Sequence, residues 1–153
     1  SMEPISNCVV AFSLMPTEIA KKVDHKAPSI EKRINTISEL ASMGWKIGLR
    51  FDPLIHGENW KILYSNLFEN VFKNIDRKVI HSITLGPLRF PKDMFKKIIS
   101  MNPRSKVLSD KLVLRGNKIS YSNGIEQEMQ SFCTGLLKDY SPETLFFSCK
   151  GNF

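Results

Sequence analysis

Hydrophobic residues follow two alternating patterns along the chain. Near-continuous apolar runs in residues 7–14, 45–51 and 79–85 are typical of buried strands. The segments after them instead place apolar residues at steps of three and four, as in Ile30, Ile34 and Ile37, which predicts amphipathic helices. This β-α-β-α-β-α order predicts parallel strands joined by right-handed crossovers.

Residues at the helix ends support these boundaries. Ser29 is a predicted N-cap, and Gly44 stands where a glycine would end the same helix. Asn59 is expected to cap the second helix, and Pro91 to open the third, which Asn102-Pro103 ends. Residues 17–23 are expected to form a further short helix.

The last third of the chain has a different pattern. Residues 107–114 and 118–121 are short β-prone runs on either side of Gly116-Asn117, which predicts a hairpin. Asn123 to Glu126 resembles a capping box that opens a C-terminal helix, and residues 144–149 suggest a final short strand. The predicted fold is a partial (half) β/α barrel of three parallel strands with helices, followed by a β-hairpin and a C-terminal helix. It forms one domain, 3–153, with β/α units in 3–104 and the hairpin and helix in 105–153.

Such a half barrel leaves unpaired backbone groups on both outer strands, which proteins usually cover. We therefore expect the sheet to be completed by another chain, by a second copy or by the C-terminal hairpin.

Composition limits the class of protein. The chain is 42% hydrophobic and 24% charged, so it is neither disordered nor a membrane protein, and no membrane partner is expected. Its net charge is +7, and residues 57–110 hold ten Lys/Arg against five Asp/Glu. This excess indicates either a solvated basic face or a surface for a polyanion such as DNA. The three cysteines lack metal-ligand or redox spacing, so no metal site is predicted and a reducing cytoplasmic location is expected.

Polar residues follow each predicted strand at its carboxyl end. Because the carboxyl ends of parallel strands meet at one edge, these side chains are expected to line a common rim. Arg50 should point away from Phe51, either into a barrel lumen or toward a salt bridge. Asp52 and His56 are also a candidate acid–base pair for a stand-alone hydrolase or isomerase, although an Asp-Pro pair is often only a turn former. The rim residues are Ser13, Arg50, Asp52, His56 and Arg89.

The predicted hairpin carries a second candidate site. Lys118 could contact phosphates, and Tyr121 could stack on a base. Alternatively, the hairpin is a solvated turn and the tyrosine packs underneath it.

Five short motifs occur in the order and at the approximate spacing of those in spore photoproduct lyases, and together they cover nearly the whole chain. They are Phe12-Ser-Leu-Met-Pro16, Ala27-Pro-Ser-Ile-Glu-Lys-Arg33, Phe51-Asp-Pro-Leu-Ile-His56, Leu85-Gly-Pro-Leu-Arg-Phe90 and Gly116-Asn-Lys-Ile-Ser-Tyr121. The chain resembles the C-terminal half of these radical S-adenosylmethionine enzymes, which repair thymine dimers in UV-damaged DNA with a [4Fe–4S] cluster.

The resemblance implies roles for the candidate residues. Ser13 and the strand leading to Asp52 would lie where S-adenosylmethionine is held, with Arg50 and His56 beside them. Arg89, Lys118 and Tyr121 would lie where lesion DNA binds. The cluster-binding cysteine motif belongs to the family's N-terminal half, so this chain is expected to be inactive alone and to need that half as a partner, or to self-associate. The catalytic residues of this chain are unknown.

Two positions depart from the family motifs. Ser120 replaces an Arg in the hairpin motif, and Met15 replaces an Asn in the first. An alternative function is therefore a degenerate, non-enzymatic module that binds nucleic acid or a partner protein through its basic surface.

Overall fold

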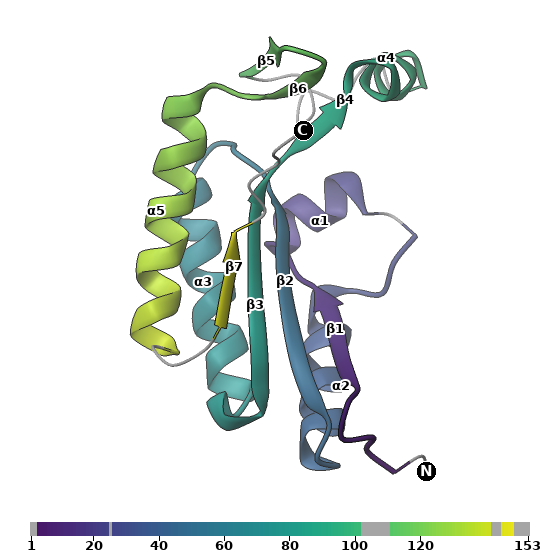
Figure 1. Cartoon of the computed structure of the whole chain (residues 1–153), viewed down its shortest axis with the longest axis vertical. Helices are drawn as coiled ribbons and strands as arrows, with labels where there is room; N and C mark the ends of the chain where they lie inside the picture. The colour runs from purple at the N-terminus through teal and green to yellow at the C-terminus, as the bar shows by residue number, and fades with distance from the viewer. Residues whose placement is uncertain (1–2, 25, 102–110, 142–144, 149–153) are drawn as a thin grey trace.

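A parallel sheet with the strand order β1-β2-β3-β7 runs through the molecule (Figure 1). The computed structural model describes residues 3–24, 26–101, 111–141 and 145–148. The strands are β1 (Val9–Ser13), β2 (Lys46–Leu54), β3 (Ile80–Pro87) and β7 (Leu145–Ser148), and every neighbouring pair is parallel. The three predicted parallel strands are thus confirmed, and the final strand predicted near the C-terminus becomes a fourth.

Three helices cover one face of this sheet. They are α2 (Ile30–Ser42), α3 (Trp60–Asn74) and α5 (Asn123–Tyr140), while the short α1 (Thr17–Val23) follows β1 and a 3-10 turn, η1 (Arg77–Val79), precedes β3. The ring of Phe51 on β2 meets that of Phe68 on α3 edge-on, with centroids 4.9 Å apart. The side chains that form this sheet–helix core are almost completely buried: Ile47, Leu49, Phe51, Ile83, Leu85, Tyr64, Phe68, Met129 and Leu137.

The helix boundaries follow local chemistry in some places and not in others. The Ser29 hydroxyl accepts from the backbone N–H of Lys32, and Gly44, with φ +89°, ends α2, so both predictions are confirmed. Asn59 does precede α3, but its side chain makes no capping hydrogen bond. The capping box is wrong, because Asn123 is already the first residue of α5 and Ser122 is its N-cap.

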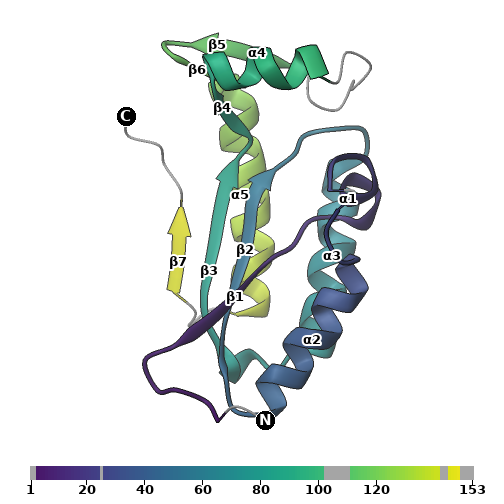
Figure 2. The same ribbon diagram turned by 90° about the vertical axis from the view of Figure 1, so that its right-hand side faces the viewer.

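The chain between β3 and α5 forms a separate lobe. β4 (Arg89–Pro91), β6 (Lys118–Tyr121) and β5 (Leu112–Arg115) make an antiparallel sheet in the order β4-β6-β5, and α4 (Lys92–Met101) packs against it. We call residues 88–101 and 111–122 the hairpin lobe. Figures 1 and 2 show it beyond the carboxyl ends of the parallel strands. The hairpin is confirmed for the described residues 112–121, whereas the start of its first strand, predicted at 107–110, and the helix end predicted at Asn102-Pro103 lie outside the described residues. β4 is an addition, since Pro91 ends a short strand directly before α4.

The edges of the parallel sheet are covered unequally. β7 pairs with β3 from Ser82 to Leu85, whereas the hairpin pairs with β4, so the hairpin does not complete the parallel sheet. Within the described part of the chain, β1 has a strand neighbour only on its β2 side. β2 also runs beyond its predicted end through Pro53 to Leu54. An irregular register after Phe51 accommodates that proline, which lacks an N–H for the ladder.

Candidate functional site at the carboxyl edge of the sheet

A polar row crosses the face of the parallel sheet that the helices leave open. Ser13, Arg50 and Thr84 are register partners on β1, β2 and β3, so they project from the same face. Arg50 Nη1 donates to Thr84 Oγ1 at 2.8 Å and to the buried Ser82 Oγ at 3.2 Å. Arg50 therefore lies opposite the buried Phe51, as predicted, and bonds to hydroxyl groups of β3.

A glycine makes room for this arginine. A Cβ atom added to Gly48 would lie 3.1 Å from Arg50 Nη2 and 3.2 Å from the Cβ of Ala11. Gly48 is two residues before Arg50 on the same strand, where a side chain would point to the same face. The sequence alone does not reveal this role, because the glycine lies inside an apolar run.

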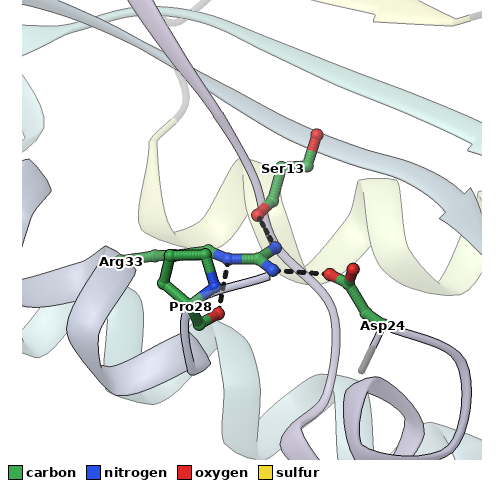
Figure 3. A network of polar contacts seen from close by, with 4 residues as sticks. All are labelled: Ser13, Asp24, Pro28 and Arg33. Carbon is green, nitrogen blue, oxygen red and sulfur yellow. Dashed lines mark hydrogen bonds and ion pairs between the residues drawn. The ribbon is translucent and has the colours of Figure 1, made fainter. Parts of the chain in front are cut away.

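The carboxyl end of β1 is fixed by Arg33 from α2 (Figure 3). The guanidinium donates to the carbonyl oxygens of Ser13 and Pro28, each at 2.9 Å, and pairs with Asp24 Oδ2 at 2.5 Å. The Arg33 side chain is only 11% exposed. Its bond to the Ser13 carbonyl leaves the Ser13 hydroxyl pointing away from the guanidinium (Figure 3).

Asp52 and Arg89 join the end of the parallel sheet to the hairpin lobe. Arg89 Nη2 lies 3.5 Å from Asp52 Oδ2, and both side chains are about one-third exposed (30% and 28%). An ion pair this accessible to water contributes little to stability. Both groups remain accessible at the rim, which brings two of the predicted residues together.

Two buried tyrosines hold the segment that follows β2. Tyr64 Oη accepts from the backbone N–H of Ile55, and Tyr121 Oη accepts from that of His56, each at 2.9 Å. Burial raises the pKa of the Tyr64 phenol above its ordinary value, so this hydroxyl stays protonated. The His56 ring lies near the rings of Trp60 and Tyr121, at centroid distances of 5.8 and 5.9 Å.

Tyr121 is completely buried, so its ring is not presented for stacking on a base. Its position matches the alternative in which the tyrosine packs beneath the hairpin. Lys118 is half-buried at the start of β6, where it is the register partner of Arg115 and Pro91.

Ser120 belongs to an internal polar network. Its Oγ lies 2.7 Å from the Leu88 carbonyl oxygen and 2.5 Å from Glu126 Oε1. The other carboxylate oxygen of Glu126 pairs with Arg115 Nη1 at 2.7 Å. Glu126 therefore ties the hairpin to α5 and does not act as a capping residue.

Among the residues that the structure describes, no group of three or more His, Cys, Asp or Glu side chains could hold a metal ion. No helix in the same described ranges combines the length and apolar character needed to cross a membrane.

Comparison with known proteins gives one consistent family. The family model for spore photoproduct lyase matches residues 5–144. Curated relatives include the spore photoproduct lyases of Clostridium acetobutylicum, 25% identical over 105 residues, and Bacillus subtilis, 28% identical over 102. These alignments cover 69% and 65% of this chain but only 31% and 30% of the relatives. The chain thus spans about a third of their length.

Solved structures show the same fold. A cysteine-to-alanine variant of spore photoproduct lyase superposes with a TM-score of 0.80 at 18% identity, covering 92% of this chain and 44% of that one. A further variant, with bound AdoMet and dinucleoside spore photoproduct, has a TM-score of 0.73 at 19% identity and covers 90% and 43%. With a parallel sheet, a hairpin lobe and a family match over most of its length, the chain belongs to the spore photoproduct lyase family.

Proposed function

We propose that this chain is the C-terminal part of a spore photoproduct lyase-like radical S-adenosylmethionine enzyme that repairs UV-induced thymine dimers in DNA. The observation that carries the proposal is the polar row Ser13–Arg50–Thr84 on the open face of the sheet. Ser13 is the last residue of β1 and Thr84 lies three residues before the end of β3, so the row is near the carboxyl ends of the strands, where ligands of such sheets bind.

The groups in and around this row suit S-adenosylmethionine. A guanidinium complements the carboxylate of its amino-acid portion, and hydroxyl or carboxylate groups complement its ribose. We assign Ser13, Arg50, Asp52 and His56 to this ligand. When bound, and with an electron from a [4Fe–4S] cluster, it supplies the radical that starts repair. The described residues provide no ligand set for that cluster, so we expect it on another part of the enzyme.

The chain's own residues orient the ligand and the lesion. Arg33 holds the Ser13 backbone, and Gly48 leaves space for Arg50 across β2. Arg89 on β4 and Lys118 on β6 belong to the hairpin lobe, where they would face the lesion. The buried Tyr121 would support the segment that follows β2, through its bond to the backbone N–H of His56. The activity would require the family's N-terminal half, which we expect beside β1, where the sheet has no described neighbour.

Reconstitution tests the proposal. The chain would be mixed with, or fused to, the cluster-binding N-terminal half of a relative, and conversion of dinucleoside spore photoproduct would be measured with S-adenosylmethionine present. We expect repair by the complex and none by either half alone. A complex of two folded halves that forms but never repairs the dinucleoside would refute the proposal.

A second candidate function, a non-enzymatic module that binds nucleic acid or a partner protein, draws support from the basic hairpin lobe. It predicts DNA binding with no repair in any combination, and a second copy at β1 in place of the N-terminal half. The oligomeric state of the isolated chain and the repair assay together separate the two functions.

A further inference from the structure

The net charge of the chain is confined to one segment. Residues 88–122 hold nine Lys/Arg and two Asp/Glu, a net charge of +7, which equals that of the whole chain. The remainder of the chain therefore has no net charge. In the described part of the hairpin lobe, seven basic residues stand against one acidic residue, Asp93.

Helix α4 presents part of this charge to solvent. None of its residues is buried, and Lys96 and Lys97 are exposed, whereas Phe95, Ile98 and Ile99 are half-buried. The Phe95 ring lies 5.9 Å from that of Phe90 on β4, which identifies the packed side of the helix. The lysines are thus displayed on the outer side.

The helix is also fixed to the hairpin. The backbone N–H of Lys92 donates to the carbonyl oxygen of Asn117 in the turn between β5 and β6, at 3.1 Å. α4 and the hairpin therefore form one lobe over the carboxyl edge of the sheet, as Figure 2 shows. A ligand held at that edge and extending past the lobe would meet the lysines of α4.

We propose that the outer face of α4, through Lys96 and Lys97, binds the sugar–phosphate backbone of DNA that flanks the lesion. The inference rests on the proposed function, because that function places a DNA strand at the edge below. Lysine is a flexible point charge suited to phosphate, so this contact is independent of base sequence. It adds affinity for the strand and takes no part in the chemistry of the lesion.

Binding to undamaged DNA tests the contact with this chain alone. Fluorescence anisotropy of a short labelled duplex would be measured over a salt series for the wild type and for Lys96→Gln/Lys97→Gln. The matched control, Lys21→Gln/Lys22→Gln, removes an adjacent exposed pair from α1 and gives the same net charge. Thermal unfolding checks that all three proteins fold.

Each phosphate contact contributes about 0.9 to the slope of log affinity against log salt. The α4 variant should therefore lose about two units of slope and on the order of tenfold or more in affinity, while the control keeps the wild-type slope. Equal losses in the two variants, an α4 variant that binds like the wild type, or a wild-type chain that does not bind would each overturn the inference.

The substrate separates this inference from the proposed function. A dinucleoside lacks flanking strand, so the reconstituted α4 variant should repair dinucleoside spore photoproduct normally and the lesion in a long duplex at a reduced rate. Failure with the dinucleoside in the wild-type complex contradicts the proposed function. Normal repair of both substrates by the α4 variant contradicts the phosphate contact of α4 but leaves the proposed function intact.

Discussion

Arg33 is the residue whose replacement should most directly loosen the end of β1. Arg33→Met replaces the aliphatic stem of the side chain but removes the guanidinium that donates to Ser13 O, Pro28 O and Asp24 Oδ2. The methionine can fill the space of the arginine stem, so the change isolates the polar contacts. We expect the unfolding free energy to fall and the segment after β1 to become more mobile.

The magnitude follows from the three bonds. A hydrogen bond to a charged group contributes about 1.5–3 kcal/mol to the free energy of unfolding. Here the accepting groups are near the surface, and the Asp24 side chain is 31% exposed, so water replaces much of each lost bond. A loss of about 2 kcal/mol results, which lowers Tm by about 4–8 °C for a domain of this size.

Chemical denaturation and calorimetry would measure the loss. Lys32→Met is the matched control, since this neighbouring side chain is exposed and should change stability by less than about 0.5 kcal/mol. Arg33→Lys keeps the charge but not the planar fork, and should recover only part of the loss. If Arg33→Met and Lys32→Met unfold at the same denaturant concentration, the guanidinium does not hold β1.

Three further predictions concern the interior. Gly48→Ala crowds the Arg50 guanidinium and should cost about 1–3 kcal/mol, whereas Gly135→Ala, where an added Cβ meets nothing within 4 Å, should not destabilise; thermal unfolding compares them. Tyr121→Phe removes the acceptor of the backbone N–H that follows β2 and should cost about 1–3 kcal/mol by denaturant titration, and an unchanged midpoint would contradict the contact. Burial raises the pKa of the Cys133 thiol from 9.0 to about 12, so the folded protein keeps a proton that the unfolded chain loses; stability should fall as pH rises above 9.0, and less steeply in Cys133→Ala.

The sequence predicts the parallel sheet well for a physical reason. Each parallel strand packs a short apolar run against the helices on the covered face, and such runs are recognisable without structural context. β4 was missed because three residues are too few to show a period. The apolar run predicts that β2 ends at residue 51, but an irregular register lets the strand continue through Pro53 to Leu54.

The candidate site is only partly predictable. Parallel strands end at the same edge of the sheet, so the sequence predicts that the polar residues after each strand lie near one another. The 3.5 Å distance between Arg89 Nη2 and Asp52 Oδ2 agrees with that prediction. The contact of Arg33 with Ser13 joins residues 20 positions apart on different elements, and no periodic pattern reports such a contact. The alternation of faces along β2 predicts that Arg50 points away from Phe51, but it does not specify that the guanidinium lies back over Gly48.

The location of the charge also needed the structure. Residues 57–110 include a stretch around α3 in which positive and negative charges nearly cancel, together with part of the basic segment. Counted together, the two parts hide how strongly the positive charge is concentrated. Because α4 packs against β4 and β6, the described basic residues belong to the hairpin lobe, residues 88–101 and 111–122, and not to the segment 57–110 as a whole. Tyr121 is a residue for which the sequence suggested a surface role that the structure does not support. It lies beside a basic turn, yet its side chain is completely buried.

The affinity of the reconstituted complex for S-adenosylmethionine tests the central claim most directly. Calorimetric titration would compare the wild type with Arg50→Met, after thermal unfolding confirms that both are folded. If the open face of the sheet holds this ligand, loss of the guanidinium should weaken binding by about tenfold or more. Equal affinities in the two folded complexes would show that the ligand does not contact this face.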